Sequence, residues 1–134
     1  MPWSLEYIEN LQIVELTISG RVSGGELKEG AAARIALGQE KGVHKYIINA
    51  RHIDAPESAT PEVYDIPTKM YAEKKLSRIS QIAVIAPLSS ESMWITGFYE
   101  DICVNRGWRV RTFLDRDLAI DWLQESGLQP NPAK

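Results

Sequence analysis

Residues 80–110 read SQIAVIAPLSSESMWITGFYEDICVNRGWRV, and the order of patterns in this stretch decides the fold. Residues 81–86 are apolar after the first position and rich in β-branched side chains, which is typical of a strand buried on both faces of a parallel sheet. Ser89 or Ser90 can serve as the N-cap of a helix, and Gly107 can end that helix in a left-handed conformation. Residues 108–113 alternate apolar and charged side chains, which indicates an edge strand. The stretch therefore predicts an interior strand, a helix and an edge strand.

The amino-terminal part of the chain predicts a hairpin followed by a helix. Period-two alternation over residues 3–8 and 11–20 indicates two antiparallel strands joined by a tight turn. Ser23 and Glu26 have the spacing of a capping box, so a helix is expected to begin there. A helix between two strands implies a right-handed crossover, so the next strand, residues 45–51, should lie parallel to its neighbour.

Strands and helices continue to alternate in the second half of the chain. Residues 51–60 are predicted as a polar loop, and Thr60 with Pro61 marks a helix start with proline at the first helical position. Pro67 removes a backbone donor, so this helix should be kinked or split. Asp115 is expected to cap the last helix.

The order of elements is strand, strand, helix, strand, helix, strand, helix, strand, helix, which is the pattern of an α/β domain. We expect a single-layer, mixed and mostly parallel five-stranded sheet with four helices. Residues 1–127 are assigned to this one domain. Residues 128–134, which include two prolines, are assigned to a loose carboxyl-terminal tail.

Composition and charge argue against several classes of protein. The chain has 134 residues and a formal net charge of −3, which argues against a nucleic-acid-binding protein with a basic face. Cys103 is the only cysteine, so no internal disulfide is expected and a reducing compartment, the cytoplasm, is favoured. No apolar run approaches the length of a membrane span, and no signal-peptide pattern is present, so neither membrane insertion nor secretion is expected.

Three strings carry a resemblance to a known family. They are INAR at 48–51, ISQIAVI at 79–85, and VRTFLD at 110–115 followed by AIDWL at 119–123. With the order of elements, they make the chain similar to the SpoIIAA-like family of the STAS superfamily, the sulphate-transporter and anti-sigma-factor-antagonist domains. The resemblance spans most of the chain and implies a noncatalytic domain. Some relatives are compared with Sec14-type lipid-binding domains, which implies an apolar ligand.

The phosphorylation switch of this family does not carry over to the chain. In anti-sigma-factor antagonists, a serine in an Asp-Ser-Ser or Asp-Ser-Thr motif at the start of the second helix is phosphorylated by the partner kinase. The chain has DAPESAT at 54–60 instead, so phosphorylation of Ser58 or Thr60 is left open. The family also usually has aspartate where Asn49 stands.

Two groups of residues are candidates for a binding site. The first lies in the loops at the carboxyl ends of the parallel strands, where ligands of open α/β sheets usually sit. The second is an aromatic and methionine stripe that predicts an apolar pocket, although ordinary core packing explains such a stripe too. The loop candidates are Asn49, Arg51, Asp54, Glu57, Ser58, Thr60, Ser89 and Ser90, and the pocket candidates are Met70, Tyr71, Trp94 and Phe98.

The leading interpretation is a noncatalytic, regulatory protein-interaction or small-ligand-binding module. A carrier of a small, lipid-like apolar ligand is the alternative. A small hydrolase using Ser89 or Ser90 with His52 and Asp54 is third, but no Gly-x-Ser-x-Gly elbow is present. His44 and His52 are too far apart along one strand for a metal site, so we expect no metal and no cofactor. A homodimer is left open.

Overall fold

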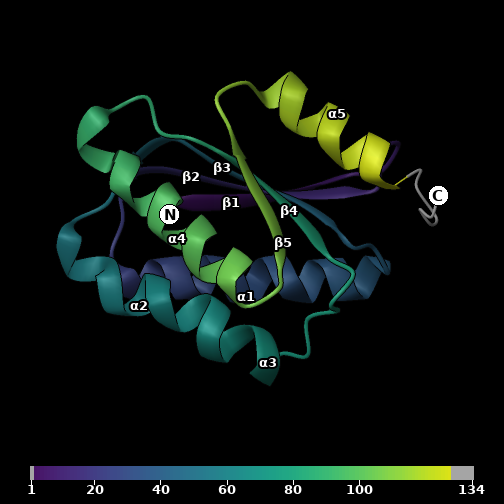
Figure 1. The fold of residues 1–134 in the computed structure, drawn as a ribbon, viewed down its shortest axis with the longest axis horizontal. Coiled ribbons are helices and arrows are strands. Elements are labelled where there is room, and N and C mark those ends of the chain that lie inside the picture. Colours follow the sequence, from purple (N-terminus) through teal and green to yellow (C-terminus); the bar gives the residue numbers. More distant parts are fainter. Residues whose placement is uncertain (1, 128–134) are drawn as a thin grey trace.

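The computed structural model describes residues 2–127, and its elements follow the predicted order (Figure 1). The strands are β1 (Trp3–Ile8), β2 (Ile13–Arg21), β3 (Lys45–Asp54), β4 (Gln81–Ile85) and β5 (Arg109–Phe113). The α-helices are α1 (Gly24–Lys41), α2 (Thr60–Asp65), α3 (Tyr71–Glu73), α4 (Met93–Asn105) and α5 (Arg116–Gly127). Shorter turns are the 3-10 segments η1 (Glu57–Ala59) and η3 (Ser90–Ser92) and the π-helical segment η2 (Ile66–Met70). The predicted tail, residues 128–134, lies outside the described residues.

The five strands form one sheet in the order β1-β2-β3-β4-β5. β1 is antiparallel to β2, and all other neighbours are parallel. β4 is therefore an interior strand, fully buried along its length, and β5 is an edge strand, as predicted. The expected mixed, mostly parallel sheet is confirmed.

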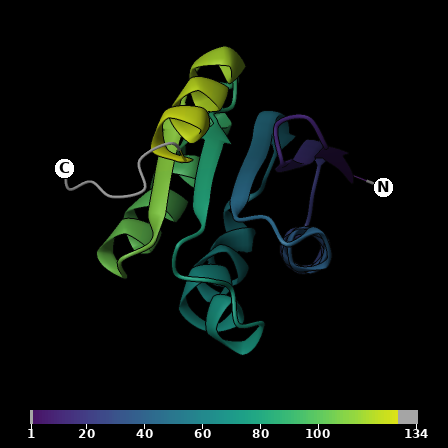
Figure 2. The same cartoon turned by 90° about the vertical axis from the view of Figure 1, so that its right-hand side faces the viewer.

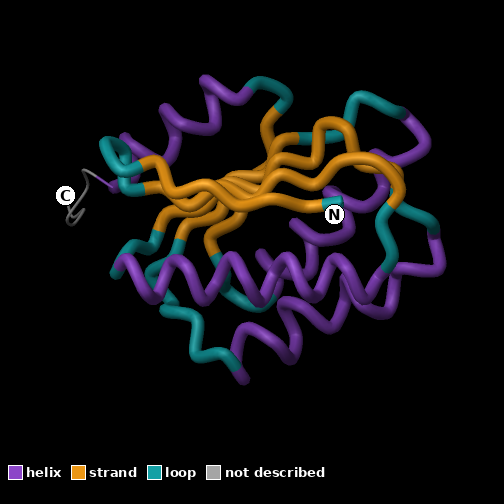
Figure 3. The backbone as a smooth tube through the Cα atoms, turned by 180° about the vertical axis from the view of Figure 1, so that it is seen from behind, coloured by secondary structure: helices purple, strands orange, loops and turns teal. Residues whose placement is uncertain are grey.

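Helices lie on both faces of the sheet (Figures 2 and 3), and an apolar core fills the space on each side. The larger core lies between the sheet and α1, α2, η2 and α4, and includes Ile35, Val63 and Tyr99. The smaller core lies under α5, where Ala119 and Leu123 are fully buried against Ile47 and its neighbours. The sheet is thus covered by most of the helices on one face and by α5 on the other.

The ends of α1 have the predicted chemistry. The Ser23 hydroxyl accepts from the Glu26 backbone N–H at 3.1 Å, and the Glu26 carboxylate accepts from the Ser23 backbone N–H at 2.9 Å. This reciprocal pair satisfies two donors that the first helical turn leaves free. Gly42 ends the helix with φ of 68°, a conformation that favours glycine.

The predicted polar loop over residues 51–60 is wrong in its first part. β3 continues to Asp54, because Ile53 remains buried and because Gly20 and Arg21 of β2 pair with Ile53 and Asp54. The residues on both sides of Ile53 are polar, so the sequence pattern did not indicate that the strand continues to Asp54. The connection that remains is short and leads into the 3-10 turn η1.

Pro67 interrupts the second helix as predicted, and the interruption has a specific form. The chain passes from α2 through the π-helical segment η2 into α3. Proline has no backbone N–H to donate, so the regular α-helical hydrogen bonds are interrupted at Pro67. The chain forms a wider, π-helical turn at this position. Met70, Tyr71 and Leu76 are buried beyond the break, so the second half still docks on the core as expected.

Candidate functional site

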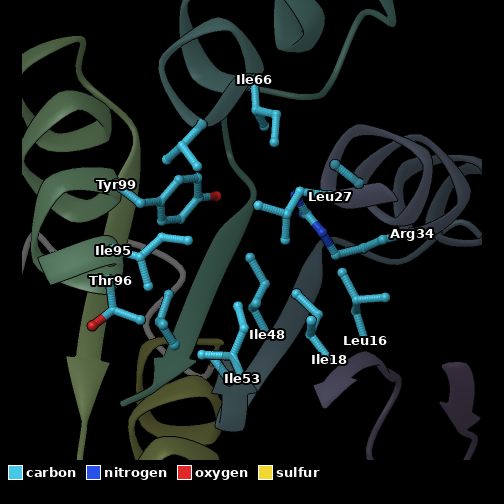
Figure 4. Close-up of a pocket in the computed structure, with 14 residues that line it drawn as sticks. Leu16, Ile18, Leu27, Arg34, Ile48, Ile53, Ile66, Ile95, Thr96 and Tyr99 are labelled. Carbon is cyan, nitrogen blue, oxygen red and sulfur yellow. The ribbon is translucent and has the colours of Figure 1, made fainter. Parts of the chain in front are cut away.

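An apolar cavity lies between the sheet and α1, α2, η2 and α4 (Figure 4). Its volume is about 60 Å³. The centre of a water molecule can occupy any point of this volume, so the cavity has room for several water molecules. The strands contribute Leu16, Ile18, Ile48, Ala50, Ile53 and Val84 to its lining, and the helical elements contribute Leu27, Ala31, Arg34, Val63, Ile66, Ile95, Thr96 and Tyr99.

A bulge in β3 shapes the sheet side of this cavity. The pairing register shifts between Thr17 and Ser19 of β2, whose partners are Asn49 and His52, so β3 has one residue more than β2 there. Side chains alternate along a strand, so a regular β3 would turn His52 toward the face that holds Ala50. The extra residue places Ile53 there instead. The bulge therefore keeps the cavity apolar and leaves His52 exposed.

Helix α1 supplies the one charged side chain in the lining. Leu27, Ala31 and Arg34 are four and three residues apart, so they share one face of the helix. The small side chain of Ala31 leaves space beside the sheet. Arg34 has no exposed surface and extends toward the cavity (Figure 4). A full positive charge thus lies in a mainly apolar wall, whose other side-chain polar groups among the described residues are the hydroxyls of Thr96 and Tyr99.

Three tyrosines surround the Arg34 guanidinium. Its Nη2 donates to the Tyr71 hydroxyl at 2.5 Å, and the Tyr71 hydroxyl is hydrogen-bonded to the Tyr99 hydroxyl. The guanidinium carbon lies 5.2 Å from the ring centre of Tyr46 and 5.5 Å from that of Tyr71, within the range of cation–π attraction. Its Nε and Nη1 have no hydrogen-bond partner among the described residues.

The groups around Arg34 do not neutralise its charge. Burial raises the pKa of Tyr71, and it raises the pKa of Tyr99 well above the usual value. Burial also raises the pKa of the Cys103 thiol to about 12. All three groups are therefore uncharged at neutral pH. Among residues 2–127, no Asp or Glu lies within ion-pair distance of Arg34.

Glu15 carries the other buried charge in the described chain, and unlike Arg34 it has an ionic partner. Glu15 is 5% exposed on the α5 face of the sheet, and its carboxylate accepts from Arg116 Nη2 at 2.6 Å and from Asn49 Nδ2 at 3.2 Å. The hydrogen bond to Glu15 raises the pKa of Arg116. Glu15 is thus paired and hydrogen-bonded, as buried charges usually are, whereas Arg34 is not paired.

Some of the predicted loop residues meet at the carboxyl end of the sheet. Asn49 Oδ1 accepts from the Arg51 backbone N–H at 3.2 Å, and Arg51 Nη2 donates to the Leu114 carbonyl at 3.2 Å. The Arg51 carbonyl accepts from the Leu88 backbone N–H at 3.0 Å. Arg51 therefore ties the ends of β3, β4 and β5 together.

The remaining loop candidates serve their own local turns. Asp54 and Glu57 are exposed, as predicted, and Asp54 pairs with Arg21 at 3.4 Å. The exposed Ser58 lies in η1, and the Thr60 hydroxyl donates to the Glu57 carbonyl at 2.6 Å. The Ser89 hydroxyl accepts from the Glu91 N–H, the capping role expected of it, and Ser90 begins η3. A functional role for these residues stays a prediction.

The predicted pocket residues lie near the cavity without lining it. Met70 and Tyr71 are buried. Tyr71 is hydrogen-bonded to Arg34, which lines the cavity, but Tyr71 is not itself a lining residue. Trp94 and Phe98 are half-buried against the core, with ring centres 6.4 Å apart. Sequence reasoning missed Arg34. A signal was present, because Arg34 falls seven residues after Leu27 on an otherwise apolar, alanine-rich face.

Membrane spans and metal sites are absent from the part of the chain that the structure describes. Within residues 2–127, no helix is both long and apolar enough to cross a membrane. The same residues contain no group of three or more His, Cys, Asp or Glu side chains that could hold a metal ion.

Comparison with solved structures identifies the fold. The chain is similar to an uncharacterized protein of the DUF3478 family from Shewanella loihica PV-4, described as having a SpoIIAA-like fold. The similarity covers 90% of this chain and 91% of that chain, with a TM-score of 0.57 and 16% sequence identity. The fold is SpoIIAA-like. No family model and no curated protein matches the sequence. The SpoIIAA-like fold expected from the sequence is thus confirmed.

Proposed function

We propose that this SpoIIAA-like domain is a noncatalytic binding module that holds a small, mainly apolar ligand in the cavity beside α1. The observation that carries the proposal is the cavity itself. Protein interiors are closely packed, and a concave, mostly apolar space lined by a few polar groups is the usual form of a ligand site. The β3 bulge, which keeps His52 out of the wall, supports the same interpretation.

The size and the open side of the cavity bear on the ligand. A space that holds several water molecules accepts a short aliphatic chain or a small ring. The cavity is partly open, so a longer chain would have to extend out of it. A small ligand that fits inside is therefore the first candidate, and the lipid cargo that the comparison with Sec14-type domains suggests is the alternative.

The test is a titration of the full chain with 1-butanol and with butanoate, followed by the NMR signals of Ile and Leu methyl groups. We expect saturable shifts at cavity methyls such as those of Leu27, Ile48 and Ile95. Ala31→Leu fills the cavity and should abolish the shifts. Ala36→Leu makes the same change at an exposed position of α1 and should keep them. Absence of saturable shifts with both compounds, or equal shifts in Ala31→Leu, would refute the proposal.

A second candidate function is docking of a protein partner at the carboxyl end of the sheet. Three large apolar side chains are exposed around this end: Leu88 is 66% exposed, Leu114 is 75% exposed and Leu118 is 55% exposed. Neighbouring exposed apolar side chains often mark protein contacts. Arg51 holds the backbone at Leu88 and Leu114, so this surface has a fixed shape. A second copy of the chain or another protein would fit it.

A further inference from the structure

The unpaired charge of Arg34 gives the cavity a chemical preference. From it we infer that the bound ligand is an anion, specifically a short-chain carboxylate whose head group lies on Arg34 and whose chain fills the apolar space. This inference rests on the proposed function, because it names the class of ligand for the same cavity.

The unpaired charge of Arg34 is unfavourable in a buried position. A guanidinium remains protonated in proteins, and removing it from water without a counter-ion is strongly unfavourable. Arg34 has no exposed surface and no carboxylate partner among residues 2–127. The tyrosine rings around it attract the charge only weakly compared with an anion. An anionic group in the cavity would supply the counter-ion that the chain itself does not.

Arg34 has free hydrogen-bond donors. Nη2 already donates to Tyr71, so the Nε hydrogen and both Nη1 hydrogens have no acceptor among the described residues. Arg34 is one of the residues that line the cavity, and its side chain points toward it (Figure 4). Carboxylate oxygens are acceptors only, and they form short, charge-assisted hydrogen bonds with guanidinium groups.

The tyrosines beside Arg34 hold its guanidinium in place. Tyr71 accepts a hydrogen bond from Arg34 and shares one with Tyr99. Tyr99 lines the cavity, and its hydroxyl is also a hydrogen-bond partner of the Cys103 thiol. Arg34 is therefore the donor that an anionic head group would use, and the aliphatic lining receives the rest of the ligand.

The experiment compares butanoate with butanamide, which has the same shape and no charge. Both are titrated into the full chain by methyl NMR, in wild type, Arg34→Met and Arg109→Met. Arg109 is exposed on β5, so its substitution removes the same charge away from the cavity. We expect butanoate to bind wild type and Arg109→Met at least about 10-fold more tightly than butanamide, and Arg34→Met to lose this preference.

The outcomes separate this inference from the proposed function. Equal binding of both compounds, or a preference for butanoate that persists in Arg34→Met, refutes the anion site and leaves the apolar cavity in place. Absence of binding by butanoate, butanamide and 1-butanol refutes both. If Arg34→Met does not fold, Arg34→Lys replaces it, because the single ammonium keeps the charge without the planar set of donors. Arg34→Lys should then retain part of the preference, and full loss or full retention would contradict the geometry described.

Discussion

The buried ion pair between Glu15 and Arg116 offers a quantitative test of how the sheet and α5 are joined. Arg116→Met would leave the Glu15 carboxylate with only Asn49 as a partner. Losing a hydrogen bond to a charged group costs about 1.5–3 kcal/mol, and breaking a fully buried pair about 3–5 kcal/mol. The Arg116 side chain is 40% exposed, so water can replace part of the lost interaction. We expect the free energy of unfolding to fall by about 2 kcal/mol.

Urea denaturation at pH 7 measures this change. Arg109→Met removes the same charge from an exposed position of β5, the strand that precedes α5 in the chain, and should change the free energy of unfolding by less than about 0.5 kcal/mol. A double-mutant cycle with Glu15→Gln should give a coupling energy of about 1–2 kcal/mol between the two positions. If Arg116→Met and Arg109→Met differ by less than about 0.5 kcal/mol, water replaces the pair fully and the reasoning is wrong.

Three further predictions concern packing, ionisation and association. Gly38→Ala places a Cβ against the buried Tyr46 hydroxyl. It should lower the free energy of unfolding by about 1–3 kcal/mol, measured by urea denaturation. A change under about 0.5 kcal/mol would show that Tyr46 moves aside freely. Folding raises the pKa of Cys103 from 9.0 to about 12, so the unfolded state loses this proton first as the pH rises. The stability that Cys103 contributes below pH 9 should therefore be lost between pH 9 and about 12. In urea denaturation at a series of pH values, Cys103→Ala should make this decline smaller. If the exposed leucines join two copies of the chain, Leu114→Glu should convert a dimer into a monomer in analytical ultracentrifugation, and an unchanged dimer would place the interface elsewhere.

Local patterns were sufficient to predict the type and order of the elements, the ends of α1, the interior position of β4 and the edge position of β5. The Thr60 cap was not found, because α2 begins at Thr60 without a side-chain cap. The apolar run at 81–86 indicates an interior strand because burial on both faces leaves no polar alternation, and the Ser23 capping box marks a helix start by its own hydrogen bonds. These features depend on residues close together in the chain, so a sequence displays them directly.

The site was harder to predict because it depends on pairing and packing across the fold. The extension of β3 past Arg51 depends on β2 as a pairing partner, and the bulge that turns Ile53 inward leaves no compositional trace. Arg34 is buried because Tyr71 of α3 and Tyr99 of α4, residues far away in the sequence, pack beside it. An arginine in a helix is ordinarily exposed, so only the assembled structure shows that this one is enclosed.

The strand order has a consequence for how the molecule folds. Each strand pairs with the strand made just before it, so no strand must be inserted between two that are already joined. Each pairing closes only the loop that contains one hairpin turn or one helical crossover, and short loop closures keep the entropic barrier low. The sheet can therefore grow from β1 to β5 in the order in which the ribosome releases it. α5, the last element in that order, then covers the face that would otherwise expose Ile13, Ile47 and Ile85 to aggregation.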